Sequence, residues 1–266
     1  MAFRERPSQA GPGPTLEIRE NQPLDRYRLA GRAVREALGR QRRVWIATGI
    51  HPEEVAALAT AFIRLESRHP GMLLVIAPER PGQCSTIYAR LRIEGGFQVR
   101  RHSDGHGCDA GTQIYLLDTP GELRAFQAAA DAAFIGSSFV TAGVADPTGP
   151  AMAGVPMVMG PYAEADEGAH DPGIQARVQR LVQSGGLRRA CDPLELSAAL
   201  DGLLVDGQLS RALGECARRA LEASLPASPA PAPGAAGHRA LAQRGLGSAG
   251  PFPVNCPDTH PNVVLQ

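Results

Sequence analysis

The sequence predicts an α/β fold, in which a single Rossmann-like domain has a parallel sheet flanked by helices. Short apolar runs of strand length alternate regularly with segments whose apolar residues recur at helical spacing. The run at 72–77 is apolar throughout, as expected of a strand that is buried on both faces. Apolar residues make up 43% of the 266 residues, which is enough for a sizeable core.

The first half of the domain begins with a helix at 24–38, which shows helical spacing and ends at Gly39. A second helix, at 52–66, starts with a proline and two glutamates, which suit a first helical turn. The other elements expected here are strands at 44–48, 72–77, 97–101 and 113–117 and a helix at 81–93.

The second half continues the same alternation, which supports one sheet rather than two domains. A loop rich in Gly, Ser and Thr separates its two strands. Three helices close the domain after the last strand. The elements expected are helices at 120–130 and 148–153, strands at 132–136 and 155–159, and helices near 173–184, 193–204 and 207–223.

Both ends of the chain have compositions unlike the middle. Residues 1–23 are rich in Pro, Gly and charge, and we expect a flexible segment there. Residues 225–266 contain eight prolines, which predict a disordered tail rich in Pro, Ala and Gly. The folded domain is therefore expected to span 24–224.

Charge and hydropathy exclude several classes of protein. Basic and acidic residues balance at 27 each, which argues against a nucleic-acid binder that works through bulk positive charge. No stretch approaches the ~20 apolar residues of a membrane span, and no apolar signal-peptide core is visible. Five scattered cysteines suit reduced thiols, so we expect a cytoplasmic protein.

Ligands of open parallel sheets bind beyond the carboxyl ends of the strands, so the strand-to-helix loops are the candidate sites. In the loop at 118–122, Asp118 or Thr119 can cap a helix that starts at Pro120. The free N–H groups of such a first turn attract phosphate. The alternative is a helix cap with no ligand.

Two other loops carry weaker signals. Gly136 permits close backbone approach, and the hydroxyls of Ser137 and Ser138 can donate to phosphate or sugar oxygens, although Gly-Ser loops are common. His51 stands at a strand end, where histidine is more often a surface or capping residue than a ligand-binding one. Neither a dinucleotide fingerprint nor a P-loop is present.

A metal site is not expected. His102, His106 and Cys108 share one Gly-rich loop, but the local sequence supplies no fourth ligand for a structural zinc ion. No motif for another cofactor is present, and we expect none.

Four segments, in order, resemble the bacterial 3-deoxy-D-manno-octulosonic acid (Kdo) transferases, over about 16–224. VWIATGIHPEE at 44–54 is similar to the family's VWVAASTHxGEE, and LVIAPERP at 74–81 to its LVPRHPER. LDTPGEL at 117–123 resembles DTxGEL, and ADAAFIGSSFV at 130–140 resembles ADxAFVGGSLV.

The resemblance implies the carboxyl-terminal half of a GT-B glycosyltransferase. It implies a domain that holds CMP-Kdo for transfer of Kdo to a lipid A precursor, in lipopolysaccharide biosynthesis at the inner face of the inner membrane, with no metal required. The family's amino-terminal half carries the acceptor site, the catalytic carboxylate and the membrane-associating surface. The substrate-binding residues implied here are His51, Arg80, Asp118, Thr119, Gly121, Glu122, Gly136, Ser137 and Ser138.

Several ligand positions depart from the family pattern. Gly149 stands where the family has a glutamate that accepts hydrogen bonds from the nucleotide ribose. Ala145 replaces a histidine, and Gly49-Ile50 replaces Ser-Thr. Glu79 stands in place of an arginine, a change that neighbouring Arg80 could offset.

These departures leave three functions open. The first is a Kdo-transferase-like domain that a partner chain completes with an acceptor half, the partner also providing any membrane association. The second is a catalytically silent pseudo-glycosyltransferase that acts as a binding or assembly module. A weaker third is another transferase or epimerase of the same layout, with Glu164 or Asp166 as its donor-site carboxylate. In each of them any ligand would be a sugar nucleotide, and no residue is assigned as catalytic.

Overall fold

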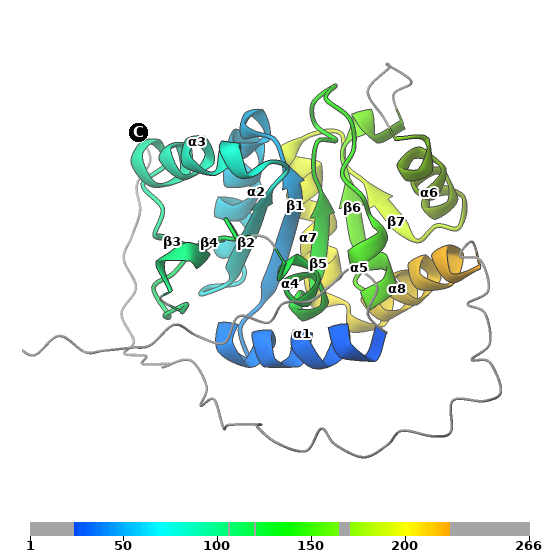
Figure 1. The fold of residues 1–266 in the computed structure, drawn as a ribbon, viewed down its shortest axis with the longest axis horizontal. Helices are drawn as coiled ribbons and strands as arrows, with labels where there is room; N and C mark the ends of the chain where they lie inside the picture. The colour runs from blue at the N-terminus through cyan, green and yellow to red at the C-terminus, as the bar shows by residue number, and fades with distance from the viewer. Residues whose placement is uncertain (1–23, 106, 120, 165–170, 224–266) are drawn as a thin grey trace, which may run out of the picture.

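A computed structural model describes residues 24–105, 107–119, 121–164 and 171–223 of the chain (Figure 1). The expected tails, 1–23 and 225–266, lie outside these ranges, as do His106 and Asp166. In the ranges described, no helix combines the length and the apolar character that crossing a membrane requires.

Seven parallel strands form one sheet in the order β3-β4-β2-β1-β5-β6-β7. The central strand β1 pairs with β2 on one side and with β5 on the other. This arrangement confirms the predicted fold class. The strands are β1 (Val44–Ile50), β2 (Leu73–Pro78), β3 (Val99–Arg101), β4 (Ile114–Leu116), β5 (Ala132–Ile135), β6 (Met157–Met159) and β7 (Leu187–Arg189).

Helices cover both faces of the sheet (Figure 1). Helices α1, α4, α5, α6 and α8 pack together over one face, and α2 and α7 pack together over the other, which also receives α3. The helices are α1 (Leu24–Leu38), α2 (Val55–Glu66), α3 (Cys84–Ala89), α4 (Leu123–Ala129), α5 (Thr148–Ala153), α6 (Pro172–Gln183), α7 (Pro193–Val205) and α8 (Gly207–Glu222).

The core consists of two apolar layers, one on each side of the sheet. Along β1, Val44 and Ile46 belong to one layer, whereas Trp45 and Ala47 belong to the other. All four are fully buried, because successive strand residues point to opposite faces and both faces are covered. Each large side chain buried in this way contributes ~1.5–3 kcal/mol. These two layers hold the strands rigidly in register, so the loops at the carboxyl ends of the strands have defined positions.

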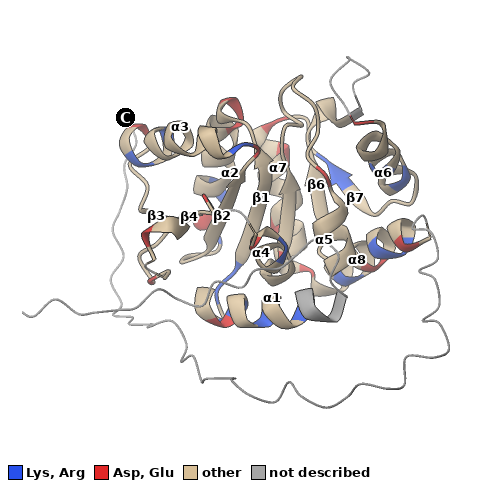
Figure 2. Cartoon of the chain, viewed as in Figure 1, with Lys and Arg blue, Asp and Glu red and all other residues tan. Residues whose placement is uncertain are grey.

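Strand β7 is absent from the sequence prediction. Its three residues are Leu187, Arg188 and Arg189, and both arginines are exposed at the edge of the sheet (Figure 2). Charged residues on a short edge strand discourage pairing with other chains. The same charges remove the apolar pattern by which a strand is predicted.

Candidate functional site

The loops at the carboxyl edge of the sheet meet near its centre. The chain first adds β2 beside β1 and later returns to place β5 on the opposite side of β1. In open parallel sheets, such a change of direction leaves a crevice beyond the carboxyl ends of the strands, where ligands bind. The loops that follow β2, β4 and β5 border this crevice.

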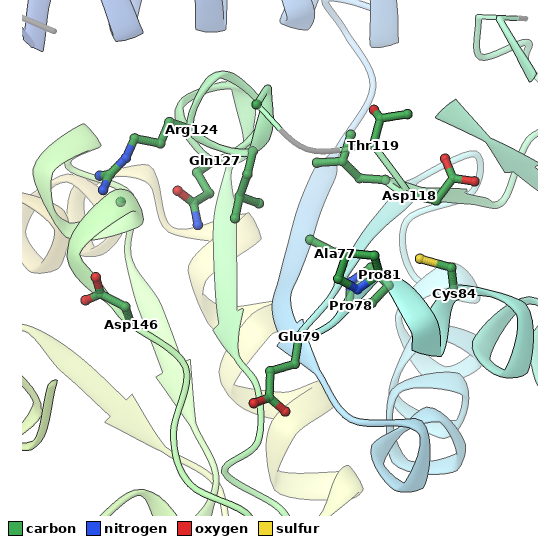
Figure 3. A pocket seen from close by; sticks show the side chains of 14 residues that line it. Ala77, Pro78, Glu79, Pro81, Cys84, Asp118, Thr119, Arg124, Gln127 and Asp146 are labelled. Carbon is green, nitrogen blue, oxygen red and sulfur yellow. The ribbon is translucent and has the colours of Figure 1, made fainter. Parts of the chain in front are cut away.

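A pocket of about 380 Å³ lies between these three loops. Figure 3 shows Arg124, Gln127 and Asp146 on one side of the pocket, with Asp118 and Cys84 on the other. Its volume falls within the range of small-molecule sites. The lining residues are Ala77, Pro78, Glu79, Pro81, Cys84, Leu117, Asp118, Thr119, Gly121, Leu123, Arg124, Gln127, Asp146 and Gly149.

The loop at 118–122 forms one wall of the pocket, but neither Asp118 nor Thr119 caps the helix. Helix α4 begins only at Leu123, after a turn in which Gly121 has a φ of +100°. The Asp118 carboxylate instead accepts hydrogen bonds from the backbone N–H (2.9 Å) and hydroxyl (2.6 Å) of Ser103. This corrects the predicted cap, because the turn delays the helix by three residues.

Glu122 points away from the pocket. Its carboxylate lies 2.5 Å from Nε2 of His102, whose Nδ1 is 2.9 Å from the hydroxyl of Tyr115. Glu122 is buried in this cluster and does not line the pocket. The Glu122 carboxylate thus ties the loop to the sheet through His102.

The backbone of the Gly-Ser loop is held by a buried carboxylate. Glu54, which is 1% exposed, accepts hydrogen bonds from the backbone N–H groups of His51 (3.0 Å), Ser137 (2.7 Å) and Phe139 (3.0 Å). Burial raises the pKa of Glu54, and these hydrogen bonds partly oppose the shift. The backbone N–H groups of Ser137 and Phe139 therefore already have an acceptor inside the fold.

The two hydroxyls of this loop also have partners inside the fold. The hydroxyl of Ser138 donates to the carbonyl of Ile135 (2.5 Å) and accepts from the backbone N–H of Gly160 (2.8 Å). The hydroxyl of Ser137 donates to the carbonyl of Gly49 at 3.0 Å. Both serines are buried, and neither lines the pocket.

Gly136 is required by packing at the same place. A Cβ atom there would lie 2.6 Å from the carbonyl oxygen of Gly49 and 2.5 Å from Cδ1 of Ile50. Its lack of a side chain therefore lets the ends of β5 and β1 approach each other, rather than opening the backbone to a ligand.

His51 and Arg80 do not line the pocket. The Arg80 side chain is 76% exposed and lies 3.8 Å from the carboxylate of Glu79. Nδ1 of His51 is 3.9 Å from the carboxylate of Glu53 and has no hydrogen-bond partner among the residues that the structure describes. Of the nine predicted residues, the pocket brings together Asp118, Thr119 and Gly121.

The replaced ligand positions pack against other residues. A Cβ at Gly49, where φ is +67°, would lie 2.2 Å from Cβ of Ala145. The backbone N–H of Ala145 donates to the carbonyl of Gly136 at 3.1 Å, which holds this loop against the end of β5. A Cβ at Gly149 would lie 1.8 Å from Oε1 of Gln127. Small residues at these positions therefore bring the loop close to its neighbours.

The pocket carries mixed charge. Glu79, Asp118 and Asp146 contribute carboxylates, of which Asp146 lies 3.2 Å from Nε of Arg177. Arg124 supplies positive charge to the lining. Such a pocket can hold a ligand that bears both an anionic group and hydrogen-bond donors.

The two thiols near this region, Cys84 and Cys108, both have a raised pKa. Burial raises the pKa of Cys84, and the nearby Asp118 carboxylate raises it further. Burial raises the pKa of Cys108 to about 12, which disfavours the thiolate that binds metals. Across the described ranges, no group of three or more His, Cys, Asp or Glu side chains is placed to hold a metal ion.

These features define a class of protein: a Rossmann-like domain with a ligand-sized pocket at the carboxyl edge of its sheet. No protein-family model matches the chain. It is 30% identical over 121 residues to a Kdo transferase of Haemophilus influenzae, covering 46% of this chain and 28% of that protein. It is 28% identical over 150 residues to that of Bordetella pertussis, covering 56% and 33%. The chain thus spans about a third of these relatives or less.

The fold agrees with a solved structure, the C-terminal CMP-Kdo binding domain of WaaA from Acinetobacter baumannii. The TM-score is 0.66 at 20% identity, over 75% of this chain and 100% of that one. The chain is therefore similar in sequence to part of the Kdo transferases, and it has the fold of the carboxyl-terminal half of a GT-B protein.

Proposed function

We propose that the pocket binds a CMP-linked sugar and that this domain holds the sugar donor in a Kdo-transferase type of reaction. One observation carries the proposal: the pocket lies at the carboxyl edge of a domain that shares its whole fold with a CMP-Kdo binding domain. Sugar nucleotides are also the ligands expected in the crevice of an open parallel sheet.

The lining suggests how such a ligand would be held. Arg124 provides a positive charge for the phosphate, where charge-assisted hydrogen bonds are strong. Glu79 and Asp146 provide acceptors for sugar or ribose hydroxyls. A phosphate placed close to the Glu79 carboxylate would be repelled, so it should lie toward Arg124.

We propose that chemistry also requires a second domain or chain. A general base must be within hydrogen-bond reach of the acceptor hydroxyl and able to take its proton. Asp118 is held by two hydrogen bonds from Ser103, and Asp146 by Thr148 and Arg177. The acceptor site, the base and any association with the inner membrane would then come from outside the residues described.

A different observation favours a second function, a catalytically silent binding or assembly module. The Gly-Ser loop has its amides and hydroxyls occupied by Glu54, Ile135 and Gly49. Positions 49, 145 and 149 carry no polar side chain. A domain can keep its fold after losing donor contacts in this way.

Titration calorimetry of the full chain with CMP, and with AMP as the control nucleotide, separates the two functions. We expect CMP to bind more tightly than AMP. Replacing Arg124 with Gln should weaken CMP binding about tenfold, because a charge-assisted contact contributes ~1.5–3 kcal/mol. The matched Arg188→Gln change on exposed β7 should leave it unchanged. No binding at millimolar CMP would contradict the proposal and favour the silent module.

A further inference from the structure

The side-chain amide of Gln127 is an unused polar group inside the pocket. Gln127 is 3% exposed, and its amide lines the pocket beside Arg124 and Asp146 (Figure 3). Among the described residues, its side chain makes no hydrogen bond. Because Gln127 borders the pocket, its amide can exchange water for a polar group of a ligand, and a ligand that pairs with it gains affinity.

Gly149 determines where this amide lies. A Cβ atom at Gly149 would be 1.8 Å from Oε1 and 2.7 Å from Cδ of Gln127. The backbone of Gly149 lies outside the left-handed region, so the helix itself would tolerate a side chain. The missing side chain therefore leaves room for the amide, which would otherwise be displaced.

An amide and a cation recognise different parts of a ligand. The Gln127 amide offers donors and an acceptor without net charge, which matches a hydroxyl or the edge of a nucleobase. A phosphate is better matched by Arg124 on the adjacent turn of α4. The two side chains can thus divide one nucleotide between them.

We infer that Gln127 is a specificity residue that binds a neutral donor–acceptor group of a nucleoside. Its amide occupies the space that the missing side chain of Gly149 leaves free. This inference rests on the proposed function, because it names the part of the ligand that the pocket recognises. The neutral group is either a ribose hydroxyl or the edge of the base.

A double-mutant cycle tests the inference by calorimetry on the full chain, with CMP and cytidine as probes. We expect Gln127→Met, which keeps the volume, to weaken both probes about tenfold and equally. Gly149→Ala should weaken both as well, since it displaces the amide. The double variant should bind no more weakly than Gln127→Met alone, because both changes remove the same contact.

Two controls make the result specific. Gln208→Met, at an exposed position of α8, should bind as the wild type does. Thermal unfolding of each variant shows that loss of binding is not loss of folding. Deoxycytidine identifies the group in contact: the effect of Gln127→Met disappears with this probe if the ribose 2′-hydroxyl is the partner, and it persists if the partner is the base or another ribose hydroxyl.

Three results would each overturn the inference while the proposed function stands. They are unchanged affinity of Gln127→Met for both probes, a loss of affinity for CMP but not for cytidine, and losses that add up in the double variant. A wild-type chain that binds neither CMP nor cytidine would overturn both together.

Discussion

The Gly-Ser loop at 136–139 and the wall at 117–127 lie along the same sheet edge, yet their polar groups are used in opposite ways. In the loop, backbone N–H groups donate hydrogen bonds to Glu54, and the serine hydroxyls donate to backbone carbonyls at the ends of β1 and β5. In the wall, the Thr119 hydroxyl has no hydrogen-bond partner in the described chain, and both Thr119 and Gln127 line the pocket. A loop composition suited to a ligand thus serves the fold, whereas the wall presents polar side chains to the pocket.

Glu54→Ala should give the largest change in stability, and it tests whether Glu54 holds the Gly-Ser loop. It would leave the buried backbone N–H groups of His51, Ser137 and Phe139 without an acceptor, and each orphaned donor costs ~1–3 kcal/mol. We expect the free energy of unfolding in urea to fall by about 3 kcal/mol or more. Glu53→Ala, at an exposed neighbour, should change it by less than ~0.5 kcal/mol. Equal effects would show that Glu54 does not hold the loop.

Ser138→Ala should have a smaller effect, confined to stability. The change leaves the backbone N–H of Gly160 without its acceptor, so we expect a loss of ~1–2 kcal/mol. CMP affinity, measured in parallel, should stay within error of the wild type. Ser67→Ala, at the exposed residue that follows α2, is the control for both measurements. Weaker CMP binding by a variant of unchanged stability would show that Ser138 contacts the ligand, and would contradict a purely structural role of its hydroxyl.

The pH dependence of stability should give the smallest effect. Burial raises the pKa of Glu54 above its ordinary 4.5, so the folded chain holds this proton more tightly than the unfolded chain. The contribution of Glu54 to stability should therefore fall as pH rises above about 4.5, and level off above the folded pKa. Urea unfolding of the wild type and Glu54→Gln across this window measures the difference. A difference that grows with pH would show a lowered pKa instead.

Much of the fold could be predicted from the sequence, because burial on both faces leaves a clear pattern. The helix at 24–38 and the strand at 72–77 lie within one residue of α1 and β2. Strand β7 could not be predicted in this way, since two of its three residues are exposed arginines. The start of α4 was placed too early because the turn at Gly121 precedes the helix.

Less of the site could be predicted, because it depends on which side chain reaches which group across the fold. The loop at 118–122, a candidate site from the sequence, does border a pocket, and Asp118 lines it. Gln127 gave no local signal, since a glutamine in a short helix is usually exposed. Glu54 did leave a trace, because it follows His51 by the three-residue spacing of a capping box. Glu54 also accepts hydrogen bonds from Ser137 and Phe139, which follow it in the sequence by 83 and 85 residues. These contacts depend on the tertiary structure and leave no local pattern.

The most direct test of the comparison is a titration of the isotope-labelled full chain with CMP, followed by amide chemical shifts. We expect CMP to change the chemical shifts of the backbone amides of Gly121 and Leu123 and of the side-chain amide of Gln127. The backbone amide shifts of Ser137 and Phe139 should stay unchanged. Shifts at Ser137 and Phe139, with none at the wall, would contradict the account.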